Sequence, residues 1–392
     1  MTWALYIPGN ESSQVNAMPK TTVLITIDGL DPEYLDVCDA PNLSEMAKRG
    51  FHVTAKCMMP SVTNVNNVSV VTGKYPTEHG ISSNYRLVRE TGEEIYMESG
   101  EYVLAETFFQ RASEMGATTI LSTSKDKLRT LLSDGATVSI SSERAPDWAV
   151  DAVGEPPPIY SLEVNGWAIR AATEAMQRSP ADIVYISTTD FAMHTYAPEQ
   201  PESQQHISIL DDAIGDLVEA HPDVTLLLTA DHGMSPKSRM VVLDDIFSRH
   251  GIAAQAVPII KDRYVVHHNN LGGCMFIYLD AGQADRVEEA AQILRETTGV
   301  EGVYSRAEAV EELKLNYERI GDLVVTGDSE TVFGPKELSD SWNDTGAGSG
   351  LRSHASPYEQ DVPIIGYNGD FNGFEFAENR DLGRYVFERV LS

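Results

Sequence analysis

The stretch LLLTADHGM, residues 226–234, holds the residues that decide the fold and the chemistry of this chain. Its apolar run is short and bounded by polar residues, which is typical of a strand buried on both faces of a parallel sheet. Asp231 and His232 follow at the end of the strand, where open α/β sheets bind their ligands. Followed by Gly233, the pair offers an oxygen and an imidazole nitrogen to one cation. A loop histidine beside a helix-capping aspartate would give the same letters.

Two other strand candidates end in an acid in the same way. Residues 22–27 (TVLITI) lead into Asp28, and residues 181–187 (ADIVYIS) precede Asp190. Further strands are predicted at 51–58 and 118–122, and helices at 41–50 (with Asn42 as the expected N-cap), 102–116, 126–133, 167–178 and 204–221. This alternation predicts an α/β fold with a doubly wound, mainly parallel sheet, interrupted by a loop or linker at residues 142–158.

The pattern changes after Met240. Residues 253–279 contain β-rich runs, residues 284–297 and 307–313 are helical, and residues 303–305 form a short strand. Residues 322–326 and 364–367 are then expected to return to the main sheet, with a Gly/Ser-rich loop at 343–350 leading to His354. Because 392 residues exceed the usual limit of one hydrophobic core, we expect two units. These are an α/β core at residues 20–240 and 321–392 and a smaller inserted α+β cap domain at residues 241–320.

Composition restricts the class of partner. A formal charge of −30 and a pI near 4.6 argue against binding to nucleic acid or to an anionic membrane, because both need a basic surface. The three cysteines are odd in number and widely spaced, which indicates reduced thiols. We expect a soluble, cytoplasmic protein, since the first twenty residues do not resemble a signal peptide and no apolar run reaches about 18 residues. A homodimer is compatible with the sequence, which does not determine the oligomeric state.

Six aspartates and histidines form a candidate metal site. Asp190 and His194 are four residues apart, so one helical turn would place both on the same face. A solvated carboxylate beside an unrelated histidine explains that spacing equally simply, and a lone histidine such as His354 is more often structural. Together the set supplies enough oxygen and nitrogen ligands for two adjacent zinc ions, and manganese or iron would accept the same ligands: Asp28, Asp190, His194, Asp231, His232 and His354.

Two metals about 4 Å apart suit in-line displacement at phosphorus, with water or a side-chain hydroxyl as the nucleophile. Thr63 is the candidate hydroxyl, because it lies between a predicted strand and a predicted helix N-terminus, where backbone amides can meet an oxyanion. The simpler interpretation is that Ser61 or Thr63 only caps the helix. The chain has no G-x-S-x-G motif, which fits activation of the hydroxyl by a metal.

The ordered motifs TIDGL, PSVTNVNN, TTDFAMH, TADHGM and LRSH followed by EQDVPII resemble the alkaline phosphatase superfamily. The similar branch holds the nucleotide pyrophosphatase/phosphodiesterases and the phosphonoacetate hydrolases, and the motifs span residues 22–367. The resemblance implies that Asp190, His194 and His354 hold one metal. It implies that the other is held by Asp28, Asp231, His232 and the nucleophile Thr63.

Two stretches, residues 59–86 and 122–132, are similar to phosphonoacetate hydrolases in particular. By that similarity Asn84 binds phosphoryl oxygens, and Lys125 and Lys127 hold the phosphonate and the carboxylate of a small dianionic substrate. The implied reaction cleaves the C–P bond of phosphonoacetate to phosphate and acetate through a phospho-threonine.

Two other functions fit the same residues. One is a phosphodiesterase or nucleotide pyrophosphatase that uses the same two metals. The other is a binding module that has kept the fold and lost the chemistry. Separately, composition alone allows Lys125 and Lys127 to be ordinary surface residues at an exposed helix start. The sequence departs from the family in two places: Ala355 follows His354, where the family usually has glycine, and residues 89–101 are unusually acidic.

Overall fold

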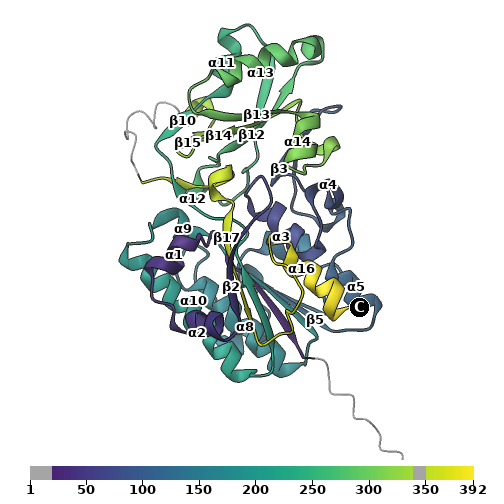
Figure 1. The fold of residues 1–392 in the computed structure, drawn as a ribbon, viewed down its shortest axis with the longest axis vertical. Helices are drawn as coiled ribbons and strands as arrows, with labels where there is room; N and C mark the ends of the chain where they lie inside the picture. The colour runs from purple at the N-terminus through teal and green to yellow at the C-terminus, as the bar shows by residue number, and fades with distance from the viewer. Residues whose placement is uncertain (1–19, 339–349) are drawn as a thin grey trace, which may run out of the picture.

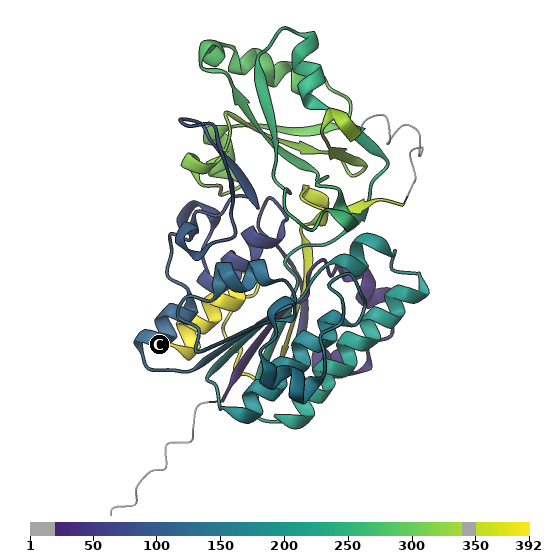
Figure 2. The ribbon, with the colours of Figure 1, turned by 180° about the vertical axis from the view of Figure 1, so that it is seen from behind.

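The computed structural model describes residues 20–338 and 350–392, which form two stacked units (Figure 1, Figure 2). The larger unit is built on a seven-stranded sheet in the order β2-β17-β8-β1-β7-β5-β6. Five neighbouring strands run parallel: β8 (Thr225–Thr229), β1 (Thr22–Thr26), β7 (Ile183–Ser187), β5 (Thr119–Thr123) and β6 (Val138–Ser141). β17 (Asp361–Tyr367) runs antiparallel to both β8 and the edge strand β2 (Phe51–Lys56). The predicted α/β fold with a mainly parallel sheet is confirmed.

Helices cover both faces of this sheet, as a doubly wound fold requires (Figure 1). One face carries α2 (Pro41–Arg49), α8 (Val164–Arg178) and α10 (Pro201–Ala220), and the other carries α3 (Thr63–Thr72), α5 (Phe108–Glu114) and α16 (Asp381–Tyr385). The central strands β1, β7 and β8 are buried along their whole length, because both faces are covered. That burial explains their apolar, β-branched sequences.

Two local predictions were wrong. The predicted linker at 142–158 contains α7 (Asp147–Val153), which packs on α8 through the buried Ala149. The N-cap of α2 is Ala40 rather than Asn42, and the helix amides are bound from a distance. The carboxylate of Asp211, on α10, accepts the N–H groups of Asn42 at 3.0 Å and of Leu43 at 2.8 Å. Because this capping residue is distant in the chain, the sequence next to α2 gives no signal of it.

The upper unit contains a four-stranded antiparallel sheet, β11 (Ala254–Pro258), β12 (Cys274–Leu279), β14 (Leu323–Gly327) and β13 (Val300–Ser305), in that order. Helices α11 (Leu243–Arg249), α13 (Val287–Arg295) and α14 (Arg306–Glu312) belong to the same unit (Figure 1). The prediction that residues 322–326 return to the main sheet was wrong, because β14 lies between β12 and β13. Its apolar sequence suits any central strand, so it could not identify its partners.

After β14 the chain forms β15 (Thr331–Phe333), which pairs with β10 (Arg239–Val241). We therefore propose that the inserted unit continues past residue 320 and ends after β15. The predicted loop at 343–350 lies outside the described residues except for Gly350. The first 19 residues also lie outside them, and the expectation that the chain has no signal peptide concerns those residues.

The two chain segments that cross between the units pair with each other. β9 (Ser235–Pro236) runs antiparallel to β16 (Arg352–Ser353). Next to them, Lys237 Nζ lies 2.7 Å from Glu359 Oε1, and both side chains are completely buried. This junction fixes the segment that carries His354.

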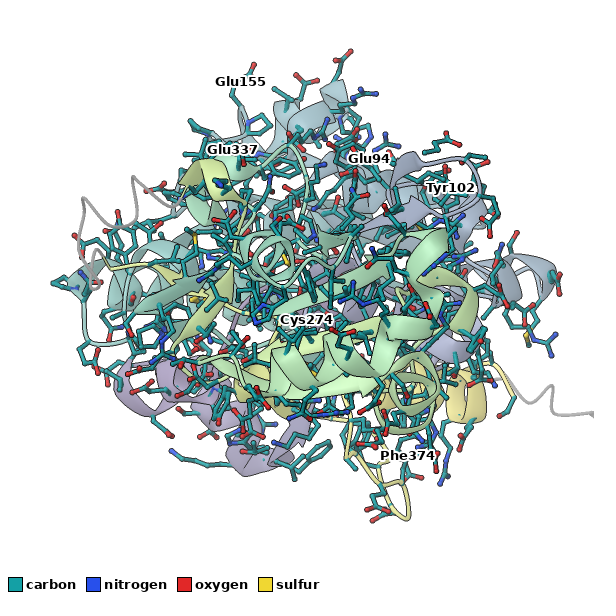
Figure 3. All side chains as sticks on the ribbon, turned by 90° about the horizontal axis from the view of Figure 1, so that it is seen from above. Glu94, Tyr102, Glu155, Cys274, Glu337 and Phe374 are labelled. Atoms are coloured by element: carbon teal, nitrogen blue, oxygen red, sulfur yellow. The ribbon has the colours of Figure 1, made fainter. Side chains whose placement is uncertain are left out.

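The described part of the chain has no helix that is both long and apolar enough to cross a bilayer. Cys38, Cys57 and Cys274 are buried and free, as the sequence predicted. Cys274 lies near the middle of the molecule in the view from above (Figure 3).

Candidate metal and substrate site

Three aspartates meet at the carboxyl edge of the main sheet. Asp28, Asp190 and Asp231 follow β1, β7 and β8, which are neighbours, and each side chain is almost completely buried. Burial, together with repulsion from the other two carboxylates, holds the pKa of Asp28 well above its ordinary range. Burial likewise raises the pKa of Asp231 to about 6. Three crowded carboxylates of this kind favour a bound cation, because a cation stabilises their ionised forms.

One cluster of possible metal ligands consists of Asp190, His194 and His354. The short helix α9 (Phe191–Thr195) starts directly after Asp190, so the predicted single helical turn is present. His194 Nε2 lies 3.0 Å from Asp190 Oδ2, and His354 Nε2 lies 3.9 Å from the same oxygen.

A second cluster consists of Asp28, Asp190 and His232, with His232 Nε2 3.3 Å from Asp28 Oδ1. Asp190 therefore belongs to both clusters. Asp231 is adjacent, with Oδ2 3.7 Å from His232 Nε2, but its Oδ1 accepts the backbone N–H groups of Gly29 and His232. The structure thus brings all six predicted ligands together and gives Asp190 a bridging position that the sequence did not indicate.

The three histidines are oriented alike. In each ring Nδ1 faces a backbone carbonyl: that of Arg352 at 2.7 Å for His194, of Gly233 at 2.9 Å for His232, and of Ser61 at 2.7 Å for His354. Because a carbonyl only accepts, Nδ1 carries the proton and the lone pair of Nε2 points toward the aspartates. Burial lowers the pKa of His232 and of His354, which keeps both rings neutral.

This donor set fits a metal. Among the described residues, Asp28 Oδ1 and His232 Nε2 are buried polar atoms without a hydrogen-bond partner. Buried polar atoms are normally satisfied, so an oxygen and a nitrogen lone pair left 3.3 Å apart point to a cation.

Thr63 is the first residue of α3 and is buried. One turn later, Asn67 Nδ2 donates to the carbonyl of Thr63 at 3.0 Å and lies 3.4 Å from Asp231 Oδ2. This amide connects the start of α3 to Asp231, which is adjacent to the second cluster. Asn84 lies beside the same turn, where its Oδ1 accepts the N–H of Asn64 at 3.1 Å.

Neither predicted lysine is a surface residue. Lys125 precedes α6 (Asp126–Leu132), and its Nζ lies 3.1 Å from Asp28 Oδ2 and 2.8 Å from Asp190 Oδ1. Burial opposes its charge, but those carboxylates outweigh burial and hold the pKa of Lys125 well above its ordinary value. Lys127, also buried, pairs with Asp262 Oδ2 at 2.5 Å. Composition alone would have allowed two exposed surface lysines, and the burial of both side chains excludes that alternative.

Three residues of the upper unit lie beside these lysines or their partners and were not predicted from the sequence: Asp262, Tyr264 and His268. The Tyr264 ring centroid is 5.6 Å from Lys125 Nζ and 5.2 Å from Lys127 Nζ. His268 Nε2 lies 3.2 Å from Asp262 Oδ1, and its ring centroid is 5.7 Å from that of His194. Burial opposes ionisation of Asp262, but Lys127 and His268 hold its pKa well below the ordinary value. These residues form no periodic pattern or motif, so no sequence signal connected them with the site.

Three comparisons place this geometry among known proteins. The profile of the family described as Type I phosphodiesterase / nucleotide pyrophosphatase matches residues 22–352. An uncharacterized pyrophosphatase/phosphodiesterase of Schizosaccharomyces pombe is 25% identical over 266 residues, which cover 63% of this chain and 52% of that protein. The venom phosphodiesterase of Naja atra is 25% identical over 58% of this chain and 28% of its own length. The chain thus spans about half the length of the first of these relatives and less of the second.

Solved structures cover nearly the whole chain. Phosphonoacetate hydrolase from Sinorhizobium meliloti 1021, in complex with phosphonoacetate, superposes with a TM-score of 0.85 and is 32% identical over 95% of this chain and 96% of that one. Murine ectonucleotide pyrophosphatase/phosphodiesterase 5 has the same fold, with a TM-score of 0.68 and 16% identity over 95% of both chains.

Proposed function

The chain belongs to the Type I phosphodiesterase / nucleotide pyrophosphatase family of the alkaline phosphatase superfamily, and we propose that it hydrolyses phosphonoacetate to phosphate and acetate. The observation that carries the proposal is the pair of buried lysines beside the aspartate and histidine clusters. Each ammonium group is held by carboxylates and by the ring of Tyr264. The S. meliloti hydrolase was solved with phosphonoacetate bound, which supports this choice of substrate.

Two metal ions, for which we propose zinc, would be held by the two clusters. Asp190, His194 and His354 would hold one, and Asp28, His232, Asp231 and Thr63 the other, with Asp190 within reach of both. When bound, the ions supply Lewis acidity that activates the attacking hydroxyl and polarises the phosphoryl oxygens. Aspartate and histidine ligands suit manganese and iron as well.

Thr63 is the proposed nucleophile. Its Oγ1 forms a bond to phosphorus while the C–P bond breaks, and the electron pair of that bond leaves with the methylene carbon. The proton lost from Thr63 balances the proton that the carbon gains as acetate forms, and water then hydrolyses the phospho-threonine. Asn84, whose Oδ1 accepts the N–H of Asn64 next to Thr63, would orient the phosphoryl group.

The proposed role of the lysines is to stabilise the carbanion that leaves when the C–P bond breaks, which is the least favourable part of this reaction. Negative charge on the methylene carbon is tolerable when it delocalises into an adjacent carboxylate held by positive groups. Lys125 and Lys127 are buried, and a fixed charge acts more strongly in a site that excludes water. In phosphodiester hydrolysis the leaving group is an alkoxide, which does not need two lysines to stabilise it.

The family description keeps phosphodiester hydrolysis as the second candidate. Lys127→Gln separates the two. Under the phosphonoacetate proposal, the variant loses at least about tenfold in kcat/KM for phosphonoacetate, since a charged hydrogen bond contributes roughly 1.5–3 kcal/mol and about 1.4 kcal/mol is a factor of ten. Its rate on bis-p-nitrophenyl phosphate stays within about threefold of the wild-type rate.

Arg129→Gln is the matched control, because Arg129 lies on the same helix and pairs with Asp126 away from the clusters. It should change neither rate. Equal losses on both substrates in the Lys127 variant, or a wild-type preference for the diester, would contradict the proposal.

A further inference from the structure

Residues 261–268, which we name the closing segment, belong to the upper unit but are held by the core. The segment includes α12 (Val265–His268) and joins β11 to β12. Lys261 Nζ lies 3.0 Å from the Tyr85 hydroxyl, and the Tyr264 hydroxyl donates to Glu143 at 2.5 Å. The ring of Tyr264 lies 5.6 Å from Lys125 Nζ and 5.2 Å from Lys127 Nζ, so the closing segment lies against the two lysines of the proposed substrate site.

Asp262 makes the central contact of this segment. Its Oδ2 lies 2.5 Å from Lys127 Nζ, and its Oδ1 accepts the backbone N–H of Tyr264 at 2.8 Å. His268 Nε2 adds a third donor at 3.2 Å, because its Nδ1 accepts the N–H of Asn270 and leaves the ring proton on Nε2. Asp262 thus keeps two hydrogen-bond donors even when Lys127 is removed.

A carboxylate on Lys127 is also what the proposed function requires of the substrate. Lys125 holds two carboxylates, but Asp28 and Asp190 are also proposed metal ligands, and a bound cation would offset their repulsion. Asp262 is not a proposed metal ligand, so Asp262 and a substrate carboxylate repel each other at Lys127 and compete for its ammonium group. We propose, on the basis of the proposed function, that Asp262 competes with the substrate carboxylate for the ammonium group of Lys127. It occupies Lys127 in the ligand-free protein, and the carboxylate of the entering substrate displaces it.

This exchange makes Asp262 a specificity-determining residue, because it favours substrates with a free carboxylate over their esters and amides. When a substrate carboxylate enters, Lys127 exchanges one carboxylate for another, and Asp262 remains bound to Tyr264 and His268. An ester or amide of the same phosphonate, which fills that position without a charge, breaks the ion pair and returns nothing to Lys127. The site therefore discriminates against esters and amides of the same phosphonate, since breaking a buried pair without replacement is costly.

The test measures binding of two anions to the metal-loaded full-length protein by calorimetry. Phosphonoformate carries a carboxylate, and inorganic phosphate does not. In Asp262→Asn the competing charge is gone, so phosphonoformate should bind about tenfold more tightly, a change of 1.4 kcal/mol, while the Kd for phosphate stays within about twofold. Weaker or unchanged phosphonoformate binding, an equal gain for both anions, or no phosphonoformate binding to either protein overturns the proposal.

Tyr264→Phe is the control for a loosened segment. It removes the hydrogen bond to Glu143 but leaves the Asp262–Lys127 pair in place. This variant should bind both anions with the same ratio as the wild type. A gain for phosphonoformate equal to that of Asp262→Asn would assign the effect to mobility of the segment and overturn competition.

A second measurement needs no variant, in case Asp262→Asn does not fold. Hydrogen exchange across residues 261–270 of the wild-type protein should be faster in the phosphonoformate complex than in the phosphate complex, because displaced Asp262 no longer anchors the segment. Equal or slower exchange overturns the proposal. The proposed function would fail separately, by absence of phosphate release from phosphonoacetate.

Discussion

Removing either partner of the Lys237–Glu359 ion pair should destabilise the protein strongly. The pair is 2.7 Å long and both side chains have no exposure, so solvent does not screen it. Loss of one partner from a buried pair costs roughly 3–5 kcal/mol, because the other charge stays buried without compensation.

The two variants should differ because the two groups have different remaining partners. In Lys237→Met, Glu359 keeps its hydrogen bonds from the N–H of Ser356 at 2.9 Å, its hydroxyl at 2.7 Å, and the hydroxyl of Ser235. In Glu359→Gln, the Lys237 ammonium stays charged, and its remaining partners are the carbonyl of Ser329 at 3.1 Å and the neutral amide of the new glutamine. We therefore expect a loss of about 3 kcal/mol for Lys237→Met and about 5 kcal/mol for Glu359→Gln.

The assay is unfolding in guanidinium chloride, followed by circular dichroism and fluorescence, whose transitions must coincide for a free energy to be defined. The double variant, which has neither charge, should lose less than the sum of the two single losses. Losses below about 1 kcal/mol for each single variant, or strict additivity, would refute this account of the junction.

Three further predictions concern the residues of the site. Ala355 has φ +85°, a left-handed conformation that favours glycine, so Ala355→Gly should raise the free energy of unfolding by about 1 kcal/mol; an unchanged or lower denaturant midpoint would contradict this. Burial raises the pKa of Asp231 to about 6, above an unfolded value of about 3.9, so its ionisation destabilises the metal-free protein as the pH rises from about 4 to 6. Zinc should therefore raise the melting temperature more at pH 7 than at pH 5, and Asp231→Asn should reduce that difference. Asp190→Asn should remove more than one equivalent of bound zinc, because Asp190 lies in both clusters, whereas His354→Gln should remove about one; equal losses by elemental analysis would argue against the bridging position.

The sequence predicted best where local pattern and tertiary position coincide. Asp28, Asp190 and Asp231 each end an apolar run, and parallel strands bring such ends to one edge, so their meeting followed from the strand predictions. His194 followed from a single helical turn. His354 has no such local signal and was found by its motif.

The misses share a physical cause. β14 pairs with β12 and β13 in the upper sheet, and the cap of α2 comes from Asp211 on another helix, so both depend on partners distant in the chain. Asp262 and His268 were missed for the same reason, since they matter only when the closing segment folds onto Lys127. The acidic stretch of residues 89–101 departs from the family pattern. In the structure Glu94 pairs with Lys261, which attaches the closing segment to the core.

The most direct measurement is phosphate release from phosphonoacetate by the zinc-loaded protein, beside bis-p-nitrophenyl phosphate, phosphonopyruvate and the Thr63→Ala variant. We predict phosphate release from phosphonoacetate by the wild-type protein well above that from the other two compounds. The Thr63→Ala variant should give none while its zinc content is retained. Release from the diester alone would place the activity in the phosphodiesterase branch, and full activity of Thr63→Ala would contradict the covalent step.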